Sequence, residues 1–331
     1  MMRSIFVFLA GFVFLISDGF AWNGNSAGSG SPEAGALRVA QMVEGNPLRR
    51  NFPAALPTLL QHINEETTLR LHPDPLIIES FEDERIFTTP LIYANFGDRQ
   101  DWNLSPRERE NLKRFLDRGG FLYIDAGINS EFLRGDISHG QHHSFADWQV
   151  SPVLEELFRD LYPETSFRRL PRSHRLFRGF YSGLPPVDEL PETVRDYVVN
   201  EKWPQGTYSF MGLRVDDRIA VLASPIVAMG WGKTERGSWA NRISFRVRES
   251  SEGLEEQLRD AAYRGERFEA VREDGREDVI YSQEPAKPSW VNEPGGAWRI
   301  FRYYHSSEIS DYAHVFYTQL GVNVFVHALT N

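Results

Sequence analysis

The segment from Pro90 to Asn129 constrains the fold of this chain more than any other. It opens with an apolar run, PLIYANF, that ends at Gly97-Asp98 and is typical of a buried strand. Ser105, Pro106 and Glu108 then form the signature of a helix N-terminus: an N-cap, a proline at the first helical position and a capping box. Gly119-Gly120 ends that helix, and FLYI follows as a second strand. A strand, helix and strand in this order predict a right-handed crossover between parallel strands.

The second strand leads into the sequence Tyr123-Ile124-Asp125-Ala126-Gly127, which we call the elbow. In open α/β sheets, ligands bind at the carboxyl ends of the parallel strands, so the elbow is the first place to expect a site. Asp125 could cap the turn there, or it could orient a ligand or a metal ion. The sequence identifies no acid/base partner that would make Asp125 a nucleophile. The candidate ligand pocket comprises Asp125, Gly127, Asn129, His174 and Trp231.

The rest of the chain predicts one α/β domain over residues 36–331, with an insertion at about 235–298. Apolar residues recur at helical spacing in three segments, 52–63, 150–161 and 308–329. Two further strands, 207–215 and 218–227, read as a hairpin turning at Asp216-Asp217. The insertion is rich in charge and predicts a small α+β segment, with a helix from Ser251 and a hairpin turning at Asp274-Gly275.

The N-terminus predicts export. Arg3 precedes an apolar run from Ile5 to Ile16, and Gly19-Phe20-Ala21 places small residues where a signal peptide would be cleaved. We therefore expect a signal peptide at 1–21, with an uncleaved anchor as the alternative, and a flexible linker at 22–35. The mature protein is then periplasmic or extracellular, and no later segment is apolar enough to predict a transmembrane span.

Composition removes several classes of function. The chain contains no cysteine, which excludes a cysteine nucleophile, thiolate metal ligands and disulfides. Its net charge of −10 argues against a nucleic-acid protein, which would carry a basic face. The sequence contains no G-x-S-x-G elbow, no P-loop and no zinc-protease helix. Whether the protein is an enzyme stays undecided at this point, with the balance against one.

Three other groups of residues could bind something. His139, His142 and His143 could share a divalent transition metal with Asp136 or Asp125, or simply lie in a polar loop; no other cofactor is predicted. Arginines near His174 could bind a phosphate, a sulfate or an acidic sugar, or pair with acids of the insertion, or face water. These candidate anion-binding residues are Arg168, Arg169, Arg172 and Arg175. His174 itself could be a buried hydrogen-bonding residue, and Trp231 could roof a pocket or cover the core.

Five segments of the chain carry a resemblance: PLIYANFGD, LSPRERENLKRFLDRGGFLYID, LPRSHRLFRGFY, RIAVLASPIVAMGWG and LGVNVFVHAL. In order and spacing they resemble the bacterial family called domain of unknown function 4159, over about two thirds of the chain. The resemblance implies a doubly wound, mostly parallel, flavodoxin-like sheet similar to that of class I glutamine amidotransferases. Catalytic relatives of that fold hold a cysteine nucleophile at the elbow, which this chain lacks. The family's usual acidic pair there is reduced to Asp125.

These observations lead to two hypotheses of different classes. The first is an exported, non-catalytic binding or assembly module on an amidotransferase-like fold, whose partners are other envelope proteins or a small or glycan ligand. The second is a metal-dependent hydrolase that acts on an envelope glycan or ester through Asp125 and the histidines of residues 139–143. An oligomeric envelope component that assembles through the insertion is a third alternative.

Overall fold

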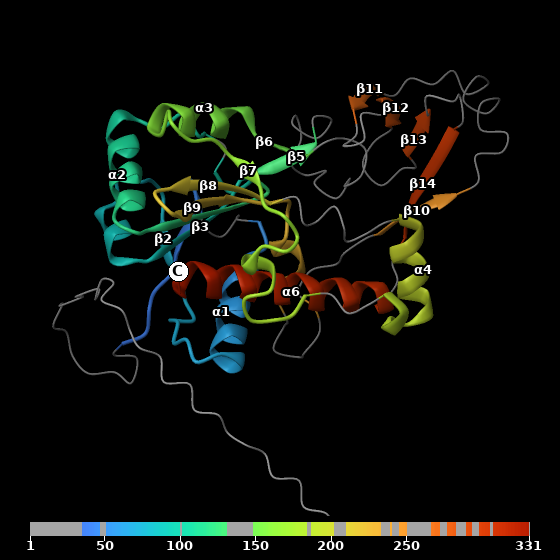
Figure 1. Ribbon diagram of the computed structural model, residues 1–331, viewed down its shortest axis with the longest axis horizontal. Coiled ribbons are helices and arrows are strands. Elements are labelled where there is room, and N and C mark those ends of the chain that lie inside the picture. The colour runs from blue at the N-terminus through green and yellow to red at the C-terminus, as the bar shows by residue number, and fades with distance from the viewer. Residues whose placement is uncertain are drawn as a thin grey trace, which may run out of the picture. The chain divides into compact units, whose positions relative to one another are not determined.

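The computed structural model describes most of the chain beyond the N-terminal segment (Figure 1). The described residues are 35–46, 51–99, 101–130, 148–183, 187–201, 210–232, 239, 245–249, 266–271, 277–282, 289–292, 298–304 and 307–330. The expected signal peptide and nearly all of the linker therefore lie outside them, as does the histidine segment 139–143.

A mixed sheet of seven strands forms the centre of the fold, in the order β2-β1-β3-β4-β9-β8-β7. Its strands are β1 (Ala40–Met42), β2 (Leu76–Ile78), β3 (Leu91–Asn95), β4 (Phe121–Asp125), β7 (Arg168–Arg169), β8 (Met211–Val215) and β9 (Arg218–Ala223). The first five in that spatial order are parallel, whereas β8 and β7 add to β9 in antiparallel fashion. The prediction of an α/β protein with a mostly parallel sheet is thus confirmed. The chain adds β2 on one side of β1 and β3 on the other, so the winding reverses between β1 and β3.

The helices cover both faces of this sheet and create two hydrophobic cores (Figure 1). The main contributors are four α-helices: α1 (Ala55–Glu66), α2 (Pro106–Asp117), α3 (Pro152–Leu161) and α6 (Ser307–Thr330). α1 and α6 pack on the face that contains Tyr93 and Tyr123, and α2 and α3 pack on the face that contains Ile92 and Ile124. Strands buried on both faces explain the continuous apolar runs in the sequence.

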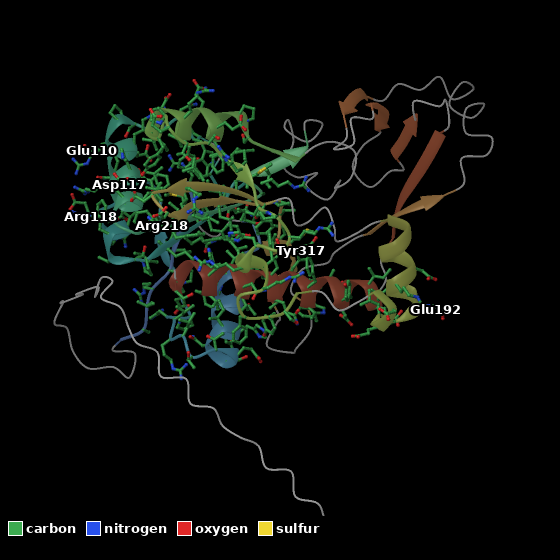
Figure 2. The ribbon with its side chains drawn as sticks, viewed as in Figure 1. Glu110, Asp117, Arg118, Glu192, Arg218 and Tyr317 are labelled. Carbon is green, nitrogen blue, oxygen red and sulfur yellow. The ribbon has the colours of Figure 1, made fainter. Side chains whose placement is uncertain are left out.

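The predicted crossover between β3 and β4 has the expected local structure. The Ser105 hydroxyl accepts the N–H of Glu108 at 3.1 Å, and the Glu108 carboxylate accepts the N–H of Ser105 at 3.0 Å, so both halves of the capping box form. Gly119 ends the helix with φ +98°, a conformation that favours glycine. Arg218, at the start of β9, donates to the carbonyls of Leu116 and Gly120 and so caps the far end of α2 (Figure 2).

Shorter elements connect these layers. Three strands or helices lie between the sheet strands: β5 (Ile128–Ser130), β6 (Trp148–Val150) and α4 (Glu192–Glu201). The short 3-10 helices are η2 (Glu84–Thr88), η5 (Arg175–Phe177), η6 (Val187–Glu189) and η8 (Ala228–Gly230). β5 and β6 pair as an antiparallel hairpin, so the chain leaves β4, makes this hairpin and enters α3. Among the described helices, none is both long and apolar enough to cross a membrane.

The insertion contains a second, five-stranded antiparallel sheet in the order β10-β14-β13-β12-β11. Its strands are β10 (Phe245–Glu249), β11 (Glu266–Val271), β12 (Glu277–Ser282), β13 (Ser289–Asn292) and β14 (Trp298–Tyr304). The predicted hairpin corresponds to β11 and β12. The helix expected from Ser251 falls outside the described residues. β14 extends to Tyr304, a few residues past the end expected for the insertion.

Candidate functional site

The elbow makes a sharp turn at the carboxyl end of β4. Ala126 has φ +59°, the left-handed conformation that residues with a Cβ atom rarely adopt. At Gly127 a Cβ atom would lie 2.9 Å from Cγ2 of Ile124, so the turn also needs a residue without a side chain. Backbone hydrogen bonds anchor the exit: Ile128 donates to Ser224 at 3.2 Å, and Ser151 donates to Gly127 at 3.0 Å.

Asp125 is completely buried, and groups from β3 and from the segment after β9 surround its carboxylate. Oδ1 accepts the N–H of Val227 at 2.7 Å and faces the Ser224 hydroxyl at 3.3 Å; Oδ2 accepts from the N–H of Ala228 at 3.2 Å, Asn95 Nδ2 at 3.1 Å and the Tyr93 hydroxyl at 3.3 Å. A carboxylate with this many donors on both oxygens is satisfied within the protein. Asp125 therefore ties β3, β4 and the start of η8 together.

Burial also changes the proton affinity of this carboxyl. Removal from water raises the pKa of Asp125 to about 6, and the N–H groups of Val227 and Ala228 limit the rise because they stabilise the charged form. Burial, and next the nearby charge of Asp125, raise the pKa values of Tyr93 and Tyr123 well above their ordinary range. Both phenols consequently keep their protons and act as hydrogen-bond donors at neutral pH.

Ser224 joins the same cluster without the partners of a nucleophile. Its Oγ lies 3.0 Å from the Tyr123 hydroxyl and 2.7 Å from the carbonyl oxygen of Pro225. The single hydroxyl proton thus has a nearer acceptor in Pro225 than in Asp125, and the Tyr123 phenol can donate to Oγ. An activated serine needs a base that removes its proton, whereas a backbone carbonyl cannot do this.

Trp231 lies inside the core beside this cluster. Its ring is completely buried, and its Nε1–H donates to the carbonyl of Tyr317 on α6 at 2.9 Å (Figure 2 labels Tyr317). The rings of Tyr93, Tyr123 and Phe325 surround it at centroid distances of 5.6, 6.2 and 6.1 Å. Gly321 makes room for it, since a Cβ atom there would lie 2.7 Å from Trp231 Nε1. The structure thus connects Trp231 to Asp125 through Tyr93.

His174 occupies a different part of the same face. It is the N-cap of η5, where Nδ1 accepts the N–H of Leu176 at 3.2 Å, and its ring lies 5.7 Å from the ring of His327 on α6. No hydrogen bond or ring contact between described residues links His174 to Asp125 or Trp231. The four predicted anion-binding arginines are all exposed, two on the edge strand β7 and two in the segment that follows it.

The remaining predicted residues lie at or near the hairpin that follows the elbow. Asn129 pairs with Gln149 between β5 and β6. The segment between these strands carries His139, His142 and His143, which lie outside the described residues. Within the described part of the chain, no three His, Asp or Glu side chains lie close enough to hold a metal ion.

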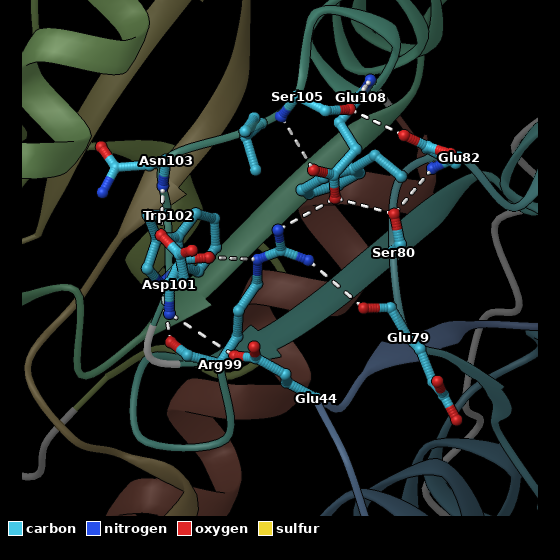
Figure 3. Close-up of polar contacts among 12 residues, drawn as sticks. Glu44, Glu79, Ser80, Glu82, Arg99, Asp101, Trp102, Asn103, Ser105 and Glu108 are labelled. Carbon is cyan, nitrogen blue, oxygen red and sulfur yellow. Dashed lines mark hydrogen bonds and ion pairs between the residues drawn. The ribbon is translucent and has the colours of Figure 1, made fainter.

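A second buried polar cluster lies after β3 (Figure 3). Arg99 donates to Glu108 at 2.9 Å, and both side chains are almost fully buried. Arg99 also packs over the rings of Phe81 and Trp102. Burial alone would raise the pKa of Glu108, but hydrogen bonds from Ser80 and Ser105 and the charge of Arg99 outweigh it, and the pKa is lowered. The pair fixes the segment after β3 to the first turn of α2.

Sequence reasoning missed the partners of Asp125, although a signal was present. β3 ends in Tyr93-Ala94-Asn95 and β4 ends in Tyr123-Ile124-Asp125, a shared pattern of tyrosine, apolar residue and short polar residue. The register pairs Tyr93 with Tyr123 and Asn95 with Asp125, so the matching positions share one face. His327 had no such signal, since it sits in an apolar helix far along the chain.

Comparison with known proteins places this geometry in a family without an assigned activity. The sequence profile described as Domain of unknown function (DUF4159) matches residues 38–329. No curated protein and no solved structure matched the chain. Because the match covers the sheet, the elbow, the insertion and α6, the chain belongs to the family of domain of unknown function 4159.

Proposed function

We propose that this protein is an exported binding module that performs no covalent chemistry at its elbow. The proposal rests on one observation: the residue in the left-handed conformation of the turn is Ala126, whose side chain is only a methyl group. In enzymes that use a nucleophile elbow, the reactive side chain sits on such a strained turn after a strand. An alanine offers no nucleophile, yet it costs about 1 kcal/mol more than glycine would in this conformation. Strain retained at the carboxyl edge of a sheet favours a functional role for this turn.

The neighbouring side chains support binding over catalysis. Asp125 and Ser224 are fully buried, and their oxygens already have partners within the protein. The parallel strands follow the order β2-β1-β3-β4-β9, which is the flavodoxin-like order, and this supports a ligand position at the carboxyl edge. The apolar N-terminal run after Arg3 supports export, and the partners would then be envelope proteins or a small or glycan ligand.

The Ala126 methyl group provides a direct test. In protein with ¹³C-labelled alanine methyls, soluble envelope glycans and peptides are added one at a time, and the Ala126 signal is followed by NMR. Binding at the elbow predicts a saturable shift of this signal and recovery of the added compound unchanged by mass spectrometry. Conversion of any compound to a product that tracks with the Ala126 shift would contradict the proposal. A buried alanine of α1, Ala55, is the internal control.

The position of the β5–β6 hairpin favours one alternative function. This hairpin starts three residues after Asp125 and frames the segment that contains His139, His142 and His143. A metal held by those histidines would lie next to the elbow in the chain and could support hydrolysis of an envelope glycan or ester. Elemental analysis of the purified protein, with zinc or manganese added, tests it. Less than one equivalent of metal and no change in melting temperature would eliminate the hydrolase.

A further inference from the structure

The open edge of the seven-stranded sheet carries a cluster of cationic groups, separate from the residues of the elbow. We define this basic cluster as Arg168 of β7, Arg214 of β8, His174 and Arg175 of the η5 segment, and His327 of α6. Arg168 pairs with Gly212 across the β7–β8 ladder, and Arg214 pairs with Ile219 across the β8–β9 ladder. Paired residues point to the same face, and Ile219 belongs to the core on the α6 side. Arg168 and Arg214 therefore lie on the face where η5 packs.

Electrostatic coupling joins four members of this cluster, all except Arg168. The charges of Arg175 and Arg214 both act on the His174 ring, and those of Arg175 and His174 act on the His327 ring. Burial is the larger cause of the lowered pKa of His174, and the nearby cations lower it further. Burial, followed by the charges of Arg175 and His174, likewise lowers the pKa of His327 to about 4. Burial, together with the nearby positive charges, thus favours the neutral form of both rings.

The arginines of the cluster lack a counter-charge within the described chain. The side chains of Arg168 and Arg175 form no ion pair or hydrogen bond with a described residue, and the Arg214 guanidinium donates to the backbone carbonyl of Asp217. Near the cluster, the carboxyl-terminal end of α6 supplies a negative dipole, which amounts to only about half a unit charge. This is unusual in a chain of net charge −10, in which acidic residues are plentiful.

The segment that presents His174 and Arg175 is held firmly. Asn323 on α6 donates to the carbonyls of Phe177 and Tyr181 at 2.8 and 3.1 Å, and its oxygen accepts the N–H groups of Phe180 and Tyr181, both at 2.8 Å. His174 Nδ1 accepts the N–H of Leu176, so the neutral ring carries its proton on Nε2. The Nε2–H group can then donate a hydrogen bond to a ligand. Fixed donors of this kind lose little entropy when they bind a ligand.

We propose that the basic cluster binds a compact oxyanion with two negative charges, a phosphate group or a sulfate ion, at the open edge of the sheet. Arg168, Arg175 and Arg214 supply planar, charged donors, and the His174 Nε2–H supplies a neutral one. Two charges on the ligand neutralise the arginines better than the single charge of a carboxylate. The site uses none of the elbow residues, so its test does not depend on whether the function proposed above is correct.

Histidine NMR tests the proposal. The ring Cε1–H signals of His174 and His327 are followed while inorganic phosphate, sulfate or acetate is added at constant ionic strength. We expect phosphate and sulfate to shift both signals saturably, acetate to bind at least about tenfold more weakly, and the pKa of both rings to rise in the complex, since the anion stabilises the imidazolium. Binding of phosphate but not of sulfate would identify a phosphate group as the ligand, and binding of sulfate alone would identify a sulfate ion.

Variants separate a built site from general charge attraction. Arg175→Gln and Arg214→Gln should each weaken phosphate binding by about tenfold, since a charge-assisted bond is lost. Arg38→Gln removes an exposed arginine at the other side of the sheet, near β1, and should leave binding unchanged. The proposal is overturned if wild-type protein shows no saturable shift, if acetate binds as well as phosphate, or if Arg38→Gln weakens binding as much as Arg214→Gln. The wild-type titration can overturn the proposal by itself, so the test remains valid even if a variant fails to fold.

Discussion

Replacing Asp125 by asparagine keeps the size of the side chain but removes its charge and converts one oxygen to an amide nitrogen. The remaining oxygen can still accept the N–H of Val227, which is the shortest bond to the carboxylate at 2.7 Å. The new NH₂ group would face two other donors, the N–H of Ala228 and the amide of Asn95. A buried donor without an acceptor costs about 1–3 kcal/mol. We expect Asp125→Asn to lower the free energy of unfolding by about 2 kcal/mol at pH 7.

The effect should depend on pH in a defined direction. Burial raises the pKa of Asp125 to about 6 in the folded protein, from an ordinary value of 3.8. Between these values the folded state binds more protons than the unfolded state, so this group stabilises wild-type protein as the pH falls and loses that contribution as the pH rises through 6. The gain between pH 7 and pH 5 is about 1 kcal/mol. Asparagine does not titrate, so the gap between the two proteins should widen from about 2 to about 3 kcal/mol.

Equilibrium urea unfolding, followed by tryptophan fluorescence at pH 5, 6 and 7, measures this gap. His327 acts in the opposite direction, since its pKa is lowered to about 4 and stability falls as its ring is forced to ionise, but it is present in both proteins and cancels. Glu108→Gln is the matched control. The pKa of Glu108 is lowered, so its effect on stability changes below pH 5 and its gap from wild type should stay flat from pH 5 to 7. A gap for Asp125→Asn that is flat, or that narrows toward pH 5, would refute the reasoning.

Three substitutions test the packing around these clusters. Ala126→Gly should raise the free energy of unfolding by about 1 kcal/mol in urea titrations, since glycine tolerates φ +59°; a loss of stability would mean that the methyl group packs well enough to outweigh the strain. Gly321→Ala should lower the melting temperature, at a cost of about 1–3 kcal/mol, because the new methyl group meets Trp231 at 2.7 Å; an unchanged melting temperature would show that α6 can shift. Asn323→Ala removes four hydrogen bonds and should speed amide exchange over residues 176–181 while exchange in β4 stays slow; equal acceleration in both would indicate global destabilisation instead.

Local sequence signals predicted the main elements of the sheet domain. The capping box at Ser105 and the glycine at position 119 fixed both ends of α2, because these signals depend only on neighbouring residues. Apolar runs located β3, β4 and β9 for the same reason. The two-residue strand β7 and the helix α4 were not predicted. β7 exists because Arg168 and Arg169 pair with β8, a partner some forty residues away that no local pattern reveals.

The site was predicted less completely than the fold. The sequence placed Asp125 at the carboxyl end of a parallel strand, and the structure puts it there. Its burial depends on η8 and on Tyr93, which approach it from other parts of the chain, so the sequence of the elbow could not reveal it. Likewise, the arginines near His174 were recognised by their density, but Arg214 joined them only through the register of β8. Long-range packing decides which polar residues remain available to a ligand.

The two polar clusters on the α6 face differ in how their charge is balanced, and this difference says where a ligand should be sought first. The charge of Asp125 is balanced by donors from its own fold, so an external cation or donor would have to displace bonds as short as 2.7 Å. The basic cluster has three arginines on exposed positions, and the carboxyl-terminal end of α6 offsets only part of their charge. A ligand gains most where it supplies charge that the fold does not. We therefore expect an anion to bind at the open edge of the sheet more tightly than any cation binds at Asp125.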